Sequence, residues 1–162
     1  MRTAAKFEKV SKKQFLSAVD RSDAEQCYED IVLPTRATKA SAGYDFFAPY
    51  DFSLASGETV TVATGVRALM PQDWVLLIYP RSGLGFKYRL RLDNTVGVID
   101  ADYADSDNEG HIFVRVTNEG PRQLFVEKGK GFAQGVFTRY LLTEDDAAQG
   151  VRNGGLGSTD QK

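Results

Sequence analysis

The segment from residue 93 to residue 103 gathers side chains from which a ligand site with a general base could be built. In chain order its chemically active positions are Asn94, Gly97, Asp100, Asp102 and Tyr103. A glycine inside the apolar run of residues 95–99 would let another backbone or a ligand come close. If the extended chain continues, period-two alternation aims Asp100 and Asp102 to the same side. The alternative interpretation is a turn whose aspartates only favour the bend.

The motif Arg81-Ser82-Gly83 follows the apolar run of residues 74–79, so we expect it where a buried strand ends. Arg81 could neutralise an oxyanion and Ser82 could donate a hydrogen bond to it, while the glycine lets backbone N–H groups approach. Ser82 is a poor candidate for a nucleophile, because only His111 could be its base and nothing in the sequence ties the two together. A turn with a capping serine is the simpler alternative.

Isolated polar residues elsewhere have two interpretations each. Asp45 stands among bulky apolar neighbours and is either a hydrogen-bonded turn residue or an outer-sphere anchor for Mg²⁺. Gln134, at the start of a late strand, is either a ligand amide or an edge polar residue. The cations Lys87, Arg89 and Arg91 alternate along the chain, which favours a solvated strand face.

The segment 149–162 is poor in apolar residues and rich in glycine, a composition typical of a mobile tail. It also couples a cation, Arg152, to free backbone amides and to the hydroxyls of Ser158 and Thr159. Such groups bind phosphate. A flexible end and a phosphate-closing tail both remain open on composition.

Length and composition predict one domain over residues 1–162 and exclude several classes of site. A formal charge of −2 argues against a general nucleic-acid binder. The single cysteine, Cys27, and single histidine, His111, rule out a disulfide framework and a zinc site built on several histidines. With no membrane-length apolar run and a charged N-terminus, we expect a complete, cytoplasmic chain without membrane or nucleic-acid partners.

Hydrophobic periodicity predicts an all-β fold preceded by one short helix. Ser11 and Gln14 have capping-box spacing, so a helix is expected over 11–20 in an N-terminal extension of residues 1–30, with 21–29 as a link. Strands are expected at 31–33, 43–47, 51–54, 58–62, 66–69, 74–80, 90–92, 95–99, 111–117, 123–126 and 133–142. The economical architecture is a distorted jelly-roll-like barrel or sandwich with a mobile glycine-rich C-terminal tail.

Taken in order, five stretches of the chain resemble the five motifs of the trimeric all-β dUTPases (dUTP pyrophosphatases). These stretches are residues 42–45, 81–83, 94–103, 129–134 and 152–159. The extra N-terminus and residues 85–89 are similar to a bacterial and phage branch of that family. The resemblance implies hydrolysis of dUTP to dUMP and pyrophosphate, with Mg²⁺ as cofactor.

The resemblance also implies roles in the reaction itself. Asp100 would orient and deprotonate the attacking water, while Arg81 and Ser82 would hold the phosphates near the α-phosphorus. Asp45 would bind water on the Mg²⁺ that the triphosphate chelates, an outer-sphere contact. In an in-line attack of water on a phosphorus, the protein mainly positions the reactants and neutralises charge, and it needs little covalent chemistry of its own.

By the same resemblance, the substrate would bind in active sites shared among the subunits of a homotrimer. The uracil edge would be read by a hairpin, and the residues at the base and deoxyribose would be Asn94, Gly97, Val98 and Tyr103. Tyr103 would leave no space for a ribose 2′-hydroxyl. The phosphates would be contacted and then enclosed by Gly83, Gln134, Arg152, Gly157, Ser158 and Thr159, while Leu156 would be the substrate-binding residue at the uracil position of the tail.

Four departures from the family pattern concern substrate closure. Leu156 stands where an aromatic usually stacks on uracil, Gly131 where a basic residue is common, and Asp160 where glycine is usual. The loop 104–110 is longer than usual and acidic. Two other functions stay open: a dCTP deaminase of the same fold, and a phage-type dUTPase that mainly binds a protein partner through this loop.

Overall fold

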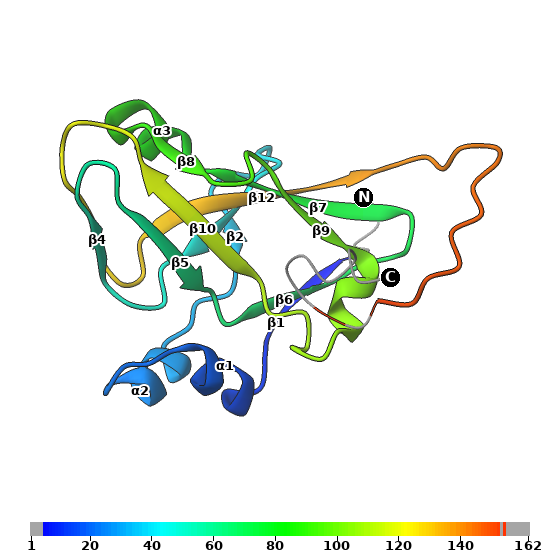
Figure 1. Ribbon diagram of the computed structural model, residues 1–162, viewed down its shortest axis with the longest axis horizontal. Helices are drawn as coiled ribbons and strands as arrows, with labels where there is room; N and C mark the ends of the chain where they lie inside the picture. The colour runs from blue at the N-terminus through cyan, green and yellow to red at the C-terminus, as the bar shows by residue number, and fades with distance from the viewer. Residues whose placement is uncertain (1–4, 153, 155–162) are drawn as a thin grey trace.

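The structure, a computed structural model, describes residues 5–152 and 154 and consists mainly of short strands (Figure 1). The strands are β1 Lys6–Lys9, β2 Thr35–Arg36, β3 Tyr44–Phe47, β4 Phe52–Leu54, β5 Thr59–Ala63, β6 Val66–Leu69, β7 Trp74–Pro80, β8 Leu90–Leu92, β9 Gly97–Asp100, β10 Phe113–Asn118, β11 Leu124–Val126 and β12 Gly131–Arg139. The helices are α1 Lys12–Ala18, α2 Ala24–Glu29, α3 Ser82–Tyr88 and the 3₁₀ helix η1 Ala101–Asp105. The predicted all-β fold class is therefore confirmed.

The strands form two sheets and two separate strand pairs. The larger sheet has the order β2-β3-β12-β7-β9, and the smaller one has the order β5-β10-β8. β1 pairs with β6, and β4 pairs with β11. These pairings are antiparallel. β12 and β7 lie side by side in the larger sheet, so they set the positions of the strands around them.

Alternating burial along the strands builds one core between the sheets. In β10 the side chains of Val114, Val116 and Asn118 are buried, while the intervening ones are more exposed. The largest fully buried side chains include Phe15, Phe46 and Phe132. Burying a side chain of this size contributes about 1.5–3 kcal/mol, so these aromatic rings dominate the packing. None of the helices within the described residues is long and apolar enough to cross a bilayer.

The predicted elements agree with the observed ones over most of the chain but fail near the N-terminus. Residues 31–33 are not a strand, because the chain leaves α2 there without pairing. The expected link 21–29 contains helix α2, whose Ala24 and Cys27 lie one turn apart and are buried. β1 was not predicted because three of its four residues are charged, and its single apolar residue, Phe7, gives no pattern of alternation.

The predicted cap of α1 is confirmed for one of its two reciprocal bonds. The Oγ of Ser11 accepts a hydrogen bond from the Gln14 backbone N–H at 3.1 Å. The N–H of Ser11 itself donates to Glu109 Oε2 at 2.7 Å, instead of to the Gln14 side chain. The acidic loop 104–110 is thereby fastened to the N-terminal extension.

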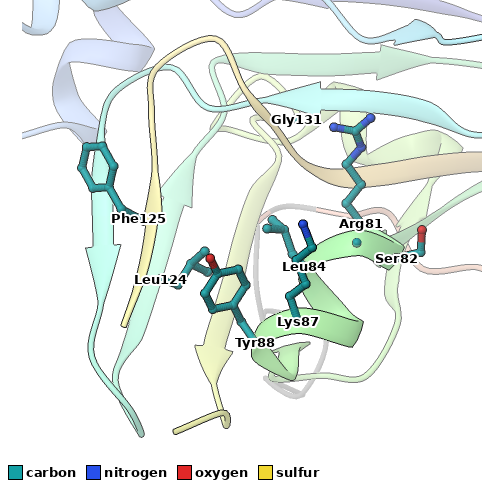
Figure 2. Close-up of a pocket in the computed structure, with 9 residues that line it drawn as sticks. Arg81, Ser82, Leu84, Lys87, Tyr88, Leu124, Phe125 and Gly131 are labelled. Carbon is teal, nitrogen blue, oxygen red and sulfur yellow. The ribbon is translucent and has the colours of Figure 1, made fainter. Parts of the chain in front are cut away.

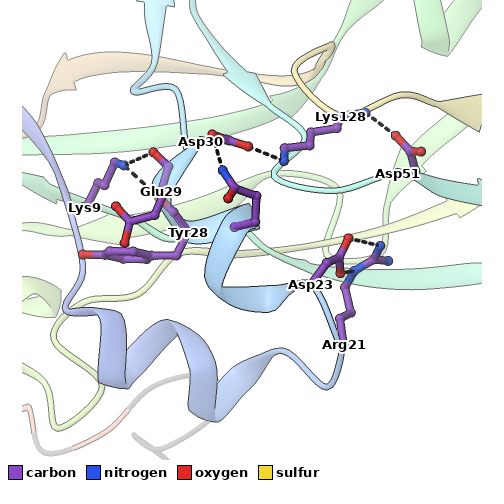
Figure 3. A network of polar contacts seen from close by, with 9 residues as sticks. Lys9, Arg21, Asp23, Tyr28, Glu29, Asp30, Asp51 and Lys128 are labelled. Carbon is purple, nitrogen blue, oxygen red and sulfur yellow. Dashed lines mark hydrogen bonds and ion pairs between the residues drawn. The ribbon is translucent and has the colours of Figure 1, made fainter.

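A second set of polar contacts ties α2 to the sheets (Figure 3). The ammonium of Lys128, between β11 and β12, lies 2.7 Å from Asp30 at the end of α2. Lys9 donates to the carbonyl oxygens of Tyr28 and Glu29 at 3.0 and 2.9 Å. A cation at the end of a helix satisfies carbonyl groups that have no partner within the helix. The extension is therefore held at both of its helices.

His111 joins the extension to the core as a neutral side chain. Its ring is fully buried, and its Nε2 accepts a hydrogen bond from the Gly65 N–H at 2.9 Å. Burial lowers its pKa from 6.5 to about 4, although nearby Glu109 acts in the opposite direction. An imidazole that accepts from a backbone N–H with Nε2 is unprotonated at that atom.

We therefore expect the free energy of unfolding to decrease as the pH falls from about 6.5 to about 4. In this interval the unfolded chain binds a proton at His111 and the folded chain does not, and the slope from this group is at most about 1.4 kcal/mol per pH unit. Urea unfolding across the interval measures it. The control is His111→Gln, which retains an acceptor for Gly65 but does not titrate, and equal slopes for the two proteins would contradict the assignment.

Candidate active site

Three of the candidate residues converge at one end of the larger sheet. In the sheet register Asp45 of β3 lies opposite Gln134 of β12, and Gln134 lies opposite Tyr79 of β7. Arg81 directly follows β7, and its Nε lies 3.3 Å from Asp45 Oδ1. The Gln134 amide donates to the Pro80 carbonyl at 3.3 Å. An acid, a cation and an amide from distant segments thus form one cluster.

Arg81 marks the change from strand to helix. Its backbone is extended, its N–H donates to the Phe132 carbonyl at 3.2 Å, and it serves as the N-cap residue of α3. Ser82 and Gly83 follow in the first turn of α3 and are exposed. First-turn N–H groups have no partner inside a helix, so they are free to meet a ligand. Lys87, expected on a strand face, lies on α3 instead.

A cavity of about 380 Å³ opens beside this cluster (Figure 2). It runs from the end of β7 along α3 to β11, and its lining residues are Arg81, Ser82, Gly83, Leu84, Lys87, Tyr88, Leu124, Phe125 and Gly131. Two of these described lining residues are cationic and none is a carboxylate. The cavity therefore favours an anionic ligand.

The cluster fits an indirect metal contact better than a metal cage. The Asp45 side chain is only 17% exposed, and Arg81 occupies one of its oxygens. Within residues 5–152 and 154 no group of three or more histidine, cysteine or acidic side chains could hold a metal ion. Mg²⁺ commonly keeps several waters and binds one or two carboxylates together with substrate phosphates. A single carboxylate such as Asp45 suits a contact to one of those waters.

The segment that precedes Asp100 lies on the other side of β7. A turn over residues 93–96 leads into β9, where Gly97 lies opposite Ile78. The expected hairpin is wrong in one respect: β8 and β9 belong to different sheets, so the turn connects two layers. Asn94 is exposed in this turn, and Val98 is 58% exposed beyond it. A Cβ at Gly97 would lie 3.0 Å from the Ile78 Cβ, so the glycine permits close packing of β9 on β7.

Asp93 anchors this turn to β10. Its carboxylate accepts hydrogen bonds from Thr117 Oγ1 and from Arg115 Nε, the latter at 2.7 Å. The hydrogen bond from the Thr117 hydroxyl, and after it the one from Arg115, lowers the pKa of Asp93 below the usual value for an aspartate. The exposed Asn94 is consequently presented from a fixed backbone.

Asp100 and Asp102 meet the same cation, although the chain does not stay extended between them. η1 begins directly after Asp100, yet Arg152 Nη2 pairs with Asp100 Oδ2 and Arg152 Nε lies 2.9 Å from Asp102 Oδ1. The Arg152 guanidinium also lies 5.9 Å from the centre of the Tyr103 ring. Sequence reasoning placed Arg152 on phosphate and did not foresee this pairing.

The hydroxyl group of Tyr103 is hydrogen-bonded within the chain. The side chain is only 7% exposed, and its hydroxyl donates to the His111 carbonyl at 2.8 Å and accepts from Asn108 Nδ2 at 2.9 Å. Burial is the main cause of its raised pKa. Only the ring is left for a ligand. The predicted tail positions Leu156, Gly157, Ser158 and Thr159 lie outside the described residues.

The two groups of candidate residues are far apart in one chain. Asp100 lies opposite Val75 at one end of β7, and Arg81 follows the other end. Six residues of strand at about 3.3 Å each separate these positions by about 20 Å. Figure 1 shows the same division, with α3 at the upper left and the helical turn after β9 at the lower right. The chain thus carries two separate groups of candidate residues, one around Arg81 and one around Asp100, which we call half sites below.

Comparison with known proteins gives a consistent result. The family model described as dUTPase matches residues 29–159. The deoxyuridine 5′-triphosphate nucleotidohydrolase of Lactococcus lactis is 43% identical over 132 residues, which cover 80% of this chain and 88% of that protein. The crystal structure of a dUTPase from Streptococcus mutans has a TM-score of 0.68 at 34% identity, covering 85% of this chain and 98% of that one. A dUTPase from phage phi11 of S. aureus, at 20% identity and a TM-score of 0.67 over 91% and 97% of the two chains, shares the fold.

The pairing of Arg152 with two aspartates makes a prediction about the C-terminal segment. Asp102→Asn should expose the bond after Arg152 and raise its rate of trypsin cleavage about threefold, since exposed ion pairs contribute about 0.2–1 kcal/mol. Mass spectrometry of a limited digest without nucleotide follows the product. Asp107→Asn, an exposed change in the neighbouring loop, is the control. A cleavage rate equal in all three proteins would show that Asp102 does not hold the segment.

Proposed function

Since the chain belongs to the dUTPase family and is a dUTP nucleotidohydrolase by homology, we propose that its half sites combine between copies of the chain to cleave dUTP into dUMP and pyrophosphate. The observation that carries this proposal is the order of the half sites along β7. Arg81 follows one end, Gly97 lies opposite Ile78, and Asp100 lies opposite Val75.

That order does not match the order of groups in the substrate. In dUTP the α-phosphorus lies between the sugar and the remaining phosphates, so the base that activates water must lie between the uracil site and the phosphate cations. In one chain the uracil-reading segment around Gly97 lies between Asp100 and Arg81 instead. Arg81 of another copy resolves the conflict. A homotrimer with three shared sites is the closed arrangement that we propose.

Asp100 is proposed as the general base. Its carboxylate takes a proton from water as the water oxygen attacks the α-phosphorus, and the bond to the bridging oxygen breaks to release pyrophosphate. Arg152 pairs with Oδ2 of this carboxylate in the free chain, so its departure would free that oxygen for the attacking water. Phosphate oxygens compete for the same guanidinium. Substrate binding and release of the base are therefore coupled.

The exposed turn after β8 suits a base-reading role. Asn94 offers an amide there, and the backbone beside Gly97 and Val98 offers donors and acceptors to the uracil edge. Tyr103, whose hydroxyl is already satisfied, would pack its ring against the deoxyribose and exclude a 2′-hydroxyl. Such a site would exclude the thymine methyl group and the ribose 2′-hydroxyl sterically. Cytosine would be disfavoured because it leaves polar groups of the backbone without partners.

The cluster around Arg81 suits the phosphates. Arg81, Ser82 and the Gly83 amide would hold the phosphate chain, with Gln134 beside them. In the proposed closed state the site would be covered by Arg152 together with Leu156, Gly157, Ser158 and Thr159. Bound Mg²⁺ would neutralise phosphate charge and polarise the α-phosphorus. Asp45 would accept a hydrogen bond from a water on that ion.

We predict that Asp100→Asn loses turnover but retains substrate affinity. Loss of a general base costs about 10²–10⁴-fold in rate, whereas the amide preserves the shape of the site. Pyrophosphate release measured with dUTP, dTTP, dCTP and UTP tests both the residue and the substrate, with Asp105→Asn as an exposed control. An active Asp100→Asn enzyme would remove Asp100 as the base. Ammonia released from dCTP by the unaltered protein would favour the deaminase instead.

Shared sites predict complementation between two inactive variants. Asp100→Asn and Arg81→Ala should each be nearly inactive, yet every mixed trimer contains one site with an intact Asp100 and an intact Arg81. An equal mixture that assembles at random should recover about a quarter of the unaltered activity. Co-refolding followed by the dUTP assay measures this recovery, and each variant refolded alone is the control. No recovery from trimers verified as mixed would place the whole site in a single chain.

A further inference from the structure

We propose that Lys87 is a second cation for the phosphate chain, binding the β- and γ-phosphates of dUTP and the pyrophosphate that departs. This inference rests on the proposed function, because it assigns Lys87 to the substrate of the same site. It extends the phosphate-binding surface beyond Arg81 and Ser82, along α3.

The cavity itself connects Lys87 to the phosphate cluster. Arg81 and Ser82 line one end, and the same cavity continues along α3 to Lys87 and Tyr88. In Figure 2 the side chains of Arg81 and Lys87 extend toward the same side of the helix. Five residues of helix at about 1.5 Å each place Lys87 about 7.5 Å along the axis from Ser82. A chain of phosphates that starts at Ser82 is long enough to meet it.

The two cations that line the cavity, Arg81 and Lys87, differ in whether an acidic side chain is paired with them. Arg81 has Asp45 as a partner at 3.3 Å. The Lys87 ammonium has no hydrogen-bond or ion-pair partner among the residues that the structure describes, and no carboxylate of that part of the chain lines the cavity. A triphosphate carries several negative charges. The unpaired Lys87 therefore supplies a positive charge to which a polyanion in the cavity can bind.

The backbone on both sides of Lys87 is fixed, which restricts where its ammonium can reach. Its carbonyl accepts a hydrogen bond from Arg122 Nη2 at 2.9 Å, and the Arg122 guanidinium lies 5.5 Å from the Tyr88 ring centre. These contacts hold the last turn of α3 against the turn between β10 and β11. Lys87 therefore needs only its own side chain to turn toward a phosphate.

The remaining walls leave room for the phosphates and strengthen their attraction. Gly131 contributes only backbone, and a Cβ there would lie 3.0 Å from Arg81 Nη1. The apolar part of the lining consists of Leu84 and Tyr88 on α3 and of Leu124 and Phe125 on β11. Apolar walls lower the local dielectric constant, so an ammonium beside them attracts phosphate more strongly than it would in open water.

Lys87→Met tests the proposal, with Lys87→Arg as the charge-retaining variant and Lys13→Met as the matched control. Lys13 is exposed on α1, outside the five motif stretches, and it does not line the cavity. We expect Lys87→Met to raise the KM for dUTP and the inhibition constant of inorganic pyrophosphate about tenfold each, the loss expected for one charge-assisted hydrogen bond. Inhibition by dUMP, which lacks the β- and γ-phosphates, should not change.

Lys87→Arg should stay within about threefold of the unaltered enzyme, and Lys13→Met should behave as the unaltered enzyme does. Unchanged pyrophosphate inhibition in Lys87→Met, or equal weakening in Lys13→Met, would overturn the proposal. Equal weakening of dUMP inhibition would overturn the assignment to the β- and γ-phosphates. If the unaltered protein releases no pyrophosphate from dUTP, the proposed function fails. Calorimetric binding of inorganic pyrophosphate then still decides whether Lys87 contributes to an anion site.

Discussion

Antiparallel pairing of β7 with both of its neighbours is the constraint on which the candidate site depends. Pairing with β12 brings Gln134 and Asp45 to the end of β7 that leads into Arg81. Pairing with β9, which Gly97 allows by packing closely on Ile78, sends Asp100 to the opposite end. The strand is rigid and extended, so no side-chain motion can close a separation of about 20 Å. The proposed sharing of sites between copies of the chain rests on this separation.

The segment that carries Asp100 is supported from the N-terminal extension. Glu109, just beyond η1, binds the cap residue Ser11, and the Tyr103 hydroxyl donates to the carbonyl of the buried His111. The proposed base therefore directly precedes a short 3₁₀ helix whose position depends on residues far away in sequence. This gives the extension a structural role, since it stabilises one half site without contributing a side chain to it.

Much of the fold could be predicted because its signals are local. Apolar alternation located the strands from β3 onward, and the Ser11 spacing located α1. α2 was missed since its two buried residues, Ala24 and Cys27, are small and surrounded by charge. The residues of the two half sites could be predicted from the motifs. Their positions in the sheet could not, because strand order depends on pairing between segments that are far apart in sequence. Lys87 was misinterpreted because Lys87, Arg89 and Arg91 alternate in sequence although a helix end divides them. Lys87 lies on α3, Arg89 is its left-handed C-cap, and only Arg91 lies on a strand.

Each half site has one arginine that is paired internally before any substrate arrives. Arg81 is paired with Asp45, while Arg152 bridges Asp100 and Asp102. A ligand with a single negative charge gains little by displacing such pairs, because each exchange replaces one ion pair with another. A triphosphate differs, since it offers several phosphate oxygens to the cations of two half sites at once. In the proposed mechanism, displacement of Arg152 from the two aspartates would couple triphosphate binding to release of the proposed base.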